Sequence, residues 1–328
     1  MAGYILKRIL YMIPTLLAIS IVAFTIINLP PGDYVDRLVI EAKNRGESMT
    51  PEAIDGLRQL YGLNKPIVEQ YVSWMSGIVL RGDFGISYKW NLPVWALLGE
   101  RLGLTVALSV ATLLFIWTVA IPIGVLSAVR QYSVWDYVFT FISFVGLAIP
   151  NFLLALGLMY ISFKYFGQSV GSLLSPEYLD APWSLAKVLD LLSHLWVPMT
   201  VLGAAGTAEL VRTLRANLLD EIKKPYVATA RTKGMPEVWM LIKYPLRHAL
   251  NPFVSSQNEI FVNLVSGGTI VSVVLGLQTI GPLLLDAFRS QDMFLAGSSI
   301  LILGALAVIG TMLSDIMLAW LDPRIRFN

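Results

Sequence analysis

Five long stretches of the sequence contain no Asp, Glu, Lys or Arg: residues 9–32, 102–129, 137–163, 260–285 and 293–314. Each is longer than the roughly 20 residues that an α-helix needs to cross a bilayer. Hydrophobic residues make up 56% of the chain and charged residues only 14%, whereas a soluble domain carries about 25% charged residues. A soluble globular fold is therefore excluded, and the chain is expected to lie in a lipid bilayer.

A sixth run, residues 191–208, is slightly shorter and contains Gly203 and Gly206, small residues that allow close helix packing in lipid. We therefore predict an all-α, polytopic membrane protein with six transmembrane helices. Residues 9–29 are too long for the core of a signal peptide, and no small-residue cleavage site follows them. The first run is accordingly expected to be a retained helix.

The distribution of Lys and Arg predicts the orientation, because short cytoplasmic loops are enriched in these residues. Among the short connections, one side carries 13 of them, in the N-terminus, at Arg130, in residues 212–253 and in the C-terminal tail. The other side carries only 3, at Lys164, Lys187 and Arg289. Both termini are therefore expected in the cytoplasm.

This topology divides the chain into three parts. Residues 1–29 form an N-terminal segment with the first transmembrane helix, residues 30–101 an extracytoplasmic helical segment, and residues 102–328 a core of five helices. The core contains a basic cytoplasmic loop at residues 212–253.

Local signals predict where helices begin and end outside the bilayer. In the extracytoplasmic segment, Thr50 followed by Pro51 is a good N-cap and first-turn pair, and Gly62 is a plausible stop. A second helix is expected to start at Pro66.

The chain offers few groups for catalysis or metal binding. The two histidines, His194 and His248, fall on opposite sides of the membrane in the predicted topology, so they cannot act as a pair. Neither a nucleophile elbow nor a phosphate-binding loop occurs, and the absence of Cys excludes disulfides and thiolate metal sites. We predict no catalytic residue, no metal site and, at a net charge of +2 without a basic tract, no nucleic-acid partner.

Ionisable and amide side chains within the apolar runs are costly in lipid and often functional. Glu259 and Asn263 share a helix face, and Asn258 lies near it. These three residues either line a translocation path or make interhelical hydrogen bonds, and both interpretations remain open. Glu209 and Arg212, three positions apart, are expected to form a structural ion pair.

The cytoplasmic loop contains the most informative pattern. Gly234 is expected to stop a short amphipathic helix, Pro236 to break the chain, and a second helix to end before Pro245. Ala228 and Ala230 are expected to form a small-residue face that fits a groove on another protein. A solvated basic loop that only holds the topology is the alternative.

Here the sequence resembles the coupling loop of importer permeases in the ATP-binding cassette superfamily, whose pattern has a fixed Gly followed by Ile-x-Leu-Pro. Gly234, Ile242 and Pro245 keep that spacing, while Tyr226 and Tyr244 replace the usual Glu and Leu, as in the variant of peptide-type permeases. The resemblance implies a coupling helix at residues 219–234, supported by Ile242 and Pro245. Its residues for the ATPase contact are Tyr226, Ala228, Thr229, Ala230, Arg231, Lys233 and Gly234.

Other blocks, in the right order along nearly the whole chain, are similar to the B-type permease subunit of dipeptide, oligopeptide, nickel and oligosaccharide importers. They lie at residues 4–15, 31–33, 61–67, 82–88, 130–137 and 321–326. The resemblance implies a type I importer permease fold in the inner membrane of a prokaryote, forming half of a translocation pore. It also implies the partners: a second, C-type permease subunit, two ATPase subunits that bind the ATP and Mg, and an extracytoplasmic solute-binding protein.

The solute-binding protein is expected to dock on residues 30–101 and 278–294. Residues 271–281 depart from the peptide-type pattern, because a Glu and a Pro-Gly pair are replaced, so the substrate class stays open between oligopeptides and oligosaccharides, with a nickel chelate as a further option. A non-transporting membrane scaffold or receptor is the rival from another class. A secondary transporter is opposed by the absence of obvious inverted halves.

Overall fold

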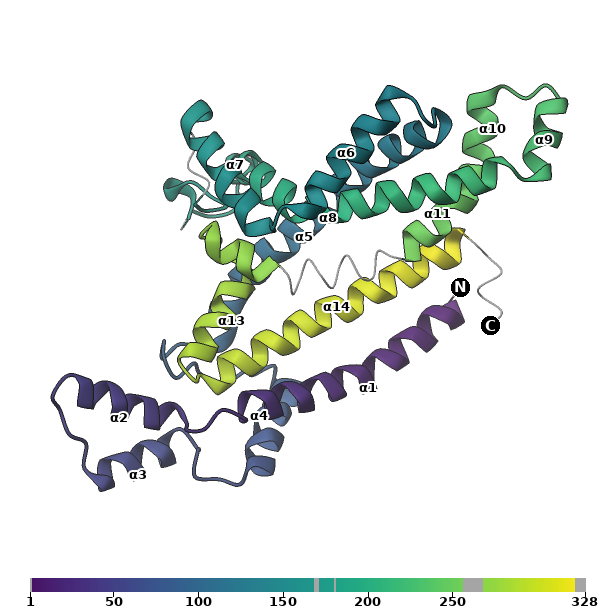
Figure 1. Cartoon of the computed structure of the whole chain (residues 1–328). Helices are drawn as coiled ribbons and strands as arrows, with labels where there is room; N and C mark the ends of the chain where they lie inside the picture. Colours follow the sequence, from purple (N-terminus) through teal and green to yellow (C-terminus); the bar gives the residue numbers. More distant parts are fainter. Residues whose placement is uncertain (1, 168–170, 180, 256–267, 322–328) are drawn as a thin grey trace. The chain divides into compact units, whose positions relative to one another are not determined.

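The computed structural model describes residues 2–167, 171–179, 181–255 and 268–321. Within these ranges the chain is helical, without strands apart from one isolated bridge between Ile86 and Pro93. The α-helices are α1 Ala2–Ile27, α2 Tyr34–Asn44, α3 Pro51–Leu60, α4 Ile67–Arg81, α5 Val94–Val129, α6 Val134–Ala148, α7 Asn151–Phe166, α8 Leu185–Ile222, α9 Pro225–Thr232, α10 Glu237–Lys243, α11 Pro245–Ser255, α13 Ile280–Arg289 and α14 Met293–Leu321 (Figure 1).

Four helices in the described ranges are long and apolar enough to cross a membrane: Ile5–Ile27, Val94–Val129, Leu185–Ile222 and Met293–Ala319. They overlap the predicted runs at residues 9–32, 102–129, 191–208 and 293–314. A multi-pass membrane protein is thereby supported, while the count of six spans and the orientation of the termini stay predictions.

The third predicted span, residues 137–163, is not one straight helix. Helix α6 ends at Ala148 and α7 begins at Asn151, and the two are bent by 107°. Pro150 explains the break, because the residue before a proline is driven out of the helical region, and Ile149 is extended at φ −82° and ψ 122°. Composition alone did not separate a continuous span from a broken one.

The fifth predicted span, residues 260–285, lies partly outside the described residues. In its described part, a helical stretch ends at Val274, Gly276 has φ +64° and α13 begins only at Ile280. The absence of charge therefore did not indicate one continuous helix here.

Local capping chemistry explains the helices between α1 and α5. Thr50 caps α3, with its side chain accepting a hydrogen bond from the amide of Ala53, and α4 begins directly after Pro66, as predicted. Helix α2 was missed. Its signal is a capping box in which Asp33 and Asp36 each accept a hydrogen bond from the other's backbone amide.

The chain divides into two compact units. One contains residues 1–8, 106–277 and 309–328, and the other residues 9–105 and 278–308. The expected docking segments, residues 30–101 and 278–294, therefore both lie in the second unit.

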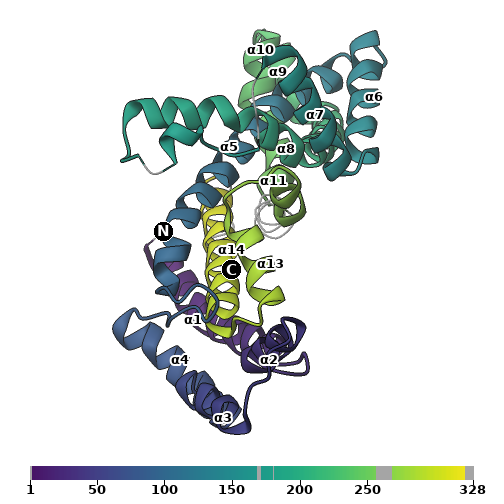
Figure 2. The same cartoon turned by 90° about the vertical axis from the view of Figure 1, so that its left-hand side faces the viewer.

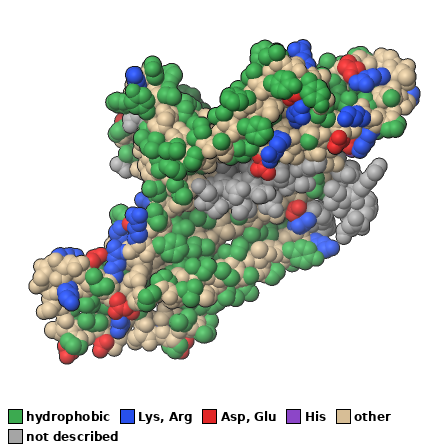
Figure 3. Space-filling model, in the orientation of Figure 1, with side chains coloured by type: hydrophobic (Ala, Val, Ile, Leu, Met, Phe, Trp, Pro, Cys, Tyr) green, Lys and Arg blue, Asp and Glu red, His purple; other side chains and the backbone are tan. Residues whose placement is uncertain are grey.

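The core of the first unit forms around α8, which contacts α6, α7 and α11. Figure 3 shows hydrophobic side chains over α6 and α7, where Phe141 and Phe144 are exposed, and charged side chains gathered at the end occupied by α9 and α10. This pattern fits helices that face lipid and a hairpin that lies outside it.

The core of the second unit is an aromatic cluster. Phe24 of α1 stacks on Trp74 of α4 with ring centroids 5.9 Å apart, and the Tyr34 hydroxyl donates to the carbonyl of Tyr88 at 2.9 Å. Helices α2 and α3 lie side by side in this unit (Figure 1).

The small residues of α8 allow close packing on α5, as predicted. A Cβ atom added at Gly203 would lie 2.7 Å from the Phe115 ring, and one at Gly206 would lie 3.0 Å from Ile116. Because an aromatic ring cannot yield as a flexible chain end does, Gly203→Ala is expected to destabilise the protein by about 1–3 kcal/mol.

Thermal unfolding of the purified protein in detergent would measure this. Gly157→Ala is the matched control, because a Cβ atom at Gly157 of α7 meets nothing within 4 Å and Ala favours helix over Gly. Equal melting temperatures for the two variants would contradict the packing argument.

Candidate functional site

Two groups of residues are candidates for function, and the first is the helical hairpin formed by α9 and α10. The two helices lie side by side at one end of the first unit (Figure 2). Gly234 has φ +72° after α9, and α10 begins directly after Pro236. The predicted stop and break are therefore confirmed.

The predicted coupling helix at residues 219–234 is not continuous. Helix α8 ends at Ile222, and α9 begins at Pro225. A proline fits the first turn of a new helix but not the interior of an old one, so the chain turns between them.

The hairpin has a small core of its own. Val227, Ala230 and Met240 are buried, and Tyr226 packs against them. Ala228 is exposed, so the expected small-residue face of Ala228 and Ala230 is wrong. Residues two positions apart are about 200° apart around a helix, and these two alanines consequently lie on opposite sides.

Tyr226 fixes the start of the hairpin. Its hydroxyl donates to the carboxylate of Glu221 at the end of α8, and its ring lies edge-on to His248 of α11 at 5.9 Å. Burial and the hydrogen bond to Glu221 raise the pKa of Tyr226 above its ordinary value, so the phenol stays neutral and donating at physiological pH.

The predicted contact residues Ala228, Thr229, Arg231, Lys233 and Gly234 are exposed on the hairpin. The Arg231 guanidinium donates to the Glu237 carboxylate at 2.6 Å, which neutralises the charge of Arg231. The hydrogen bond from Arg231 lowers the pKa of Glu237.

The two residues expected to support the coupling loop differ in their exposure. Pro245 is buried at the start of α11, whereas Ile242 of α10 is exposed. The candidate path residues Asn258, Glu259 and Asn263 lie outside the described residues.

Within the described helices, the expected ion pair of Glu209 with Arg212 is absent. Instead, Arg215 one turn later makes a bidentate pair with Asp136 of α6, with both N–O distances 2.8 Å. The partners are 79 positions apart, so no local pattern could have revealed the pair. Asp315 of α14 pairs with Arg8 of α1 at 2.6 Å.

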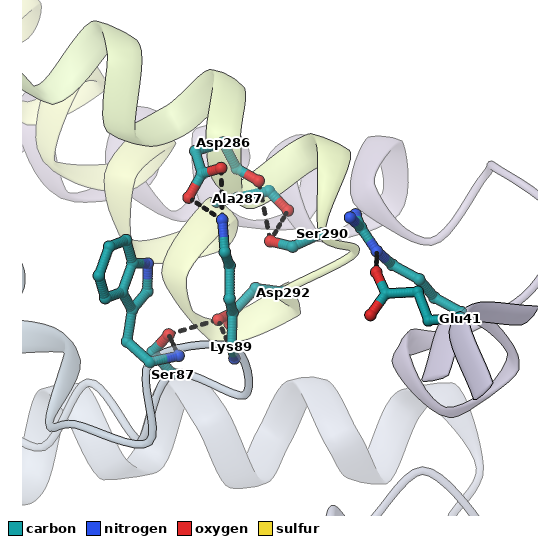
Figure 4. A network of polar contacts seen from close by, with 9 residues as sticks. Glu41, Ser87, Lys89, Asp286, Ala287, Ser290 and Asp292 are labelled. Carbon is teal, nitrogen blue, oxygen red and sulfur yellow. Dashed lines mark hydrogen bonds and ion pairs between the residues drawn. The ribbon is translucent and has the colours of Figure 1, made fainter. Parts of the chain in front are cut away.

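The second candidate group is a polar network in the second unit, which fastens the turn before α5 to the junction of α13 and α14 (Figure 4). The buried Asp292 accepts hydrogen bonds from the Ser87 hydroxyl at 2.5 Å, the Lys89 amide at 3.2 Å and the Leu295 amide at 3.1 Å. The Lys89 ammonium donates to the Asp286 carboxylate at 2.6 Å. The network therefore joins the two segments expected to dock the solute-binding protein.

Burial raises the pKa of Asp292 above its ordinary value of 3.8, while the hydrogen bonds from Ser87 and the backbone lower it by less. An acid whose pKa is raised on folding lowers stability as pH rises from its unfolded to its folded pKa. Ser87→Ala removes a donor to the anion, so it should raise the pKa further and destabilise by about 1.5–3 kcal/mol at neutral pH. Below the raised folded-state pKa, where the carboxyl of the native protein is neutral, the loss should shrink.

Thermal unfolding between pH 4 and pH 8 would measure this dependence. Ser76→Ala is the control, because the Ser76 hydroxyl donates to the Ser73 carbonyl one turn earlier. A pH-independent effect of Ser87→Ala would contradict the assignment.

Neither group suggests metal chemistry. Over the described ranges, no three His, Asp or Glu side chains are arranged to hold a metal ion.

Comparison with known proteins agrees with this architecture. Residues 120–327 match the family model for the binding-protein-dependent transport system inner membrane component, and residues 1–109 match that of its N-terminal region. The oligopeptide transport system permease protein AppB of Bacillus subtilis is 33% identical, with 100% of both chains covered. A putative peptide permease protein of Brucella suis is 33% identical and the dipeptide transport system permease protein DppB of Escherichia coli 29%, each with 99% of both chains covered. The chain belongs to the family of inner membrane components of binding-protein-dependent transport systems.

Proposed function

We propose that this chain is a permease subunit of an ATP-driven importer, which forms half of a translocation pore for peptides delivered by an extracytoplasmic solute-binding protein. The observation that carries the proposal is the α9–α10 hairpin. It has its own core of Val227, Ala230 and Met240, and it leaves Gly234 exposed at its turn. A self-contained hairpin on the long helix α8 is suited to transmit movement from an ATPase to the bundle.

Peptides are the proposed substrate because the relatives covered over their full length are named oligopeptide, dipeptide or peptide permeases. Oligosaccharides are the second candidate substrate, since no relative named above is an oligosaccharide permease. ATP and Mg belong in this proposal to the ATPase partners, and this chain works in the inner membrane without a cofactor of its own.

The second unit is the proposed docking site for the solute-binding protein. It contains both expected segments, residues 30–101 and 278–294, joined by the Ser87–Asp292 hydrogen bond and the Lys89–Asp286 ion pair. A surface of fixed shape suits recognition of a rigid partner, because little freedom is lost when it binds.

The test is purification of the tagged chain from its native cells, followed by reconstitution in proteoliposomes. Recovery of two ATPases and a second permease, with ATP-dependent peptide uptake that requires the solute-binding protein, is the expected result. Recovery of the chain alone or with a signalling partner would favour a scaffold or receptor. Uptake of oligosaccharides but not peptides would overturn the substrate only.

A further inference from the structure

A cleft of about 360 Å³ opens within the second unit, where the segment after α1 and helix α2 meet the junction of α13 and α14. Its inner lining includes the apolar side chains of Ile27, Ala287 and Ala296. Two arginines, Arg37 of α2 and Arg289 of α13, also line it. The cleft therefore combines apolar surface with guanidinium groups.

The carboxylates nearest the cleft are already engaged within the chain. Asp36, which lines the cleft, accepts a hydrogen bond from Arg58 at 2.6 Å. Glu41 accepts one from the Nε of Arg37 at 2.9 Å (Figure 4). Arg58 also pairs with Asp33, and Arg37 is the partner of Glu41. Arg289 is therefore the cation of the cleft lining with which no carboxylate of the described residues pairs.

The arginines, in contrast, keep unused donors. The Nη1 of Arg37 is buried without a hydrogen-bond partner. In the described part of the chain, the exposed Arg289 has no ion pair and no side-chain hydrogen bond. A guanidinium presents five N–H donors in a planar fork that matches a carboxylate, so the charge of the cleft favours a carboxylate ligand.

The surroundings of the cleft favour a protein as the source of that carboxylate. Ile40 and Phe288, which line it, are 59% and 39% exposed. Arginine and aromatic side chains are enriched at the centres of protein–protein interfaces. The Ser87–Asp292 hydrogen bond holds the chain next to Gln291, another lining residue, so the cleft is continuous with the proposed docking surface.

Resting on the proposed function, we infer that this cleft receives an Asp or Glu side chain from the surface of the solute-binding protein, held by Arg37 and Arg289. The carboxylate accepts hydrogen bonds from the two guanidinium groups, while apolar atoms of the partner cover Ile40 and Phe288. The contact steers the loaded binding protein to one orientation on the permease.

The variant to test is Arg289→Glu in the assembled complex, because Arg289 is exposed and its replacement removes no ion pair or side-chain hydrogen bond within the described residues. The matched control is Lys164→Glu, which makes the same charge change at the exposed end of α7, outside the cleft and outside both docking segments. Binding of the loaded solute-binding protein and its stimulation of ATPase activity are measured at low and high salt.

We expect Arg289→Glu to raise the Kd for the solute-binding protein by about tenfold at low salt, and by less at high salt. Lys164→Glu should have little effect. At saturating concentrations of the solute-binding protein, its stimulation of the ATPase activity of the Arg289→Glu complex should reach the wild-type level. A single acidic-to-Arg change on the solute-binding protein should restore affinity for the Arg289→Glu complex and lower affinity for the wild-type complex.

An unchanged Kd for Arg289→Glu would overturn the inference, and so would failure of every acidic-to-Arg change to restore binding. If Arg289→Glu leaves the Kd unchanged and slows the uptake only of acidic peptides, the cleft binds the peptide. This outcome also overturns the inference. If the solute-binding protein does not stimulate the wild-type complex at all, the proposed function itself fails.

Discussion

Asp136→Ala is expected to destabilise the protein by about 3 kcal/mol, because it leaves the Arg215 guanidinium without its counter-charge. The Asp136 side chain is 3% exposed and that of Arg215 26%. The same carboxylate accepts a hydrogen bond from the Tyr132 amide at 2.9 Å, so its loss also releases the turn before α6. Thermal unfolding of the purified protein would measure the effect.

The double variant Asp136→Leu with Arg215→Met provides the critical comparison. Replacing both members of a buried ion pair by apolar residues costs much less than removing one of them. The double variant should therefore be more stable than Asp136→Ala. Asp220→Ala, an exposed carboxylate of the same helix α8, should leave stability nearly unchanged. If the stability lost in the double variant equals the summed losses of Asp136→Leu and Arg215→Met, the pairing is refuted.

Gly234→Arg is expected to reduce peptide uptake by the assembled importer to below about one tenth of the wild-type rate, since a lost interface hot spot costs at least 2 kcal/mol. A Cβ atom at Gly234 meets nothing within 4 Å, so the isolated chain has room for the side chain. The positive φ of +72° costs a non-glycine residue about 1–2 kcal/mol. A loss of uptake larger than this conformational cost then arises from a partner that covers the turn.

Gly234→Asn separates these two effects, because Asn tolerates the left-handed conformation better than other side chains. It should assemble and transport at a rate near wild type. Uptake and ATPase activity are measured in proteoliposomes with equal amounts of each complex. If Gly234→Arg transports as well as Gly234→Asn, the hairpin turn does not contact the ATPase.

The parts of the fold that sequence could predict are those with local causes. Thr50, Pro66 and Gly234 marked helix ends correctly, because a cap, a missing amide or a positive φ acts within one turn of the chain. The charge-free runs likewise indicated apolar helices, although Pro150 broke one of them.

The rest depended on contacts between distant parts of the chain. The Asp136–Arg215 and Ser87–Asp292 pairs join residues 79 and 205 positions apart, and composition contains no information about such pairing. The α9–α10 hairpin shows the same limit within a short segment. Ala230 was expected on the contact face, but it is buried in the hairpin core with Met240 of the following helix.

Helix α8 runs unbroken for 38 residues and ends two residues before the hairpin. At a rise of about 1.5 Å per residue it is a rod roughly 57 Å long. Pro198 lies inside it and has no amide proton to donate to the His194 carbonyl, which weakens the rod at one place. A push on the hairpin therefore acts on the longer of the two parts of α8 that meet at Pro198. The residues of α8 after Pro198 then move together. The movement reaches the residues before Pro198 only to the extent that the helix is stiff at Pro198.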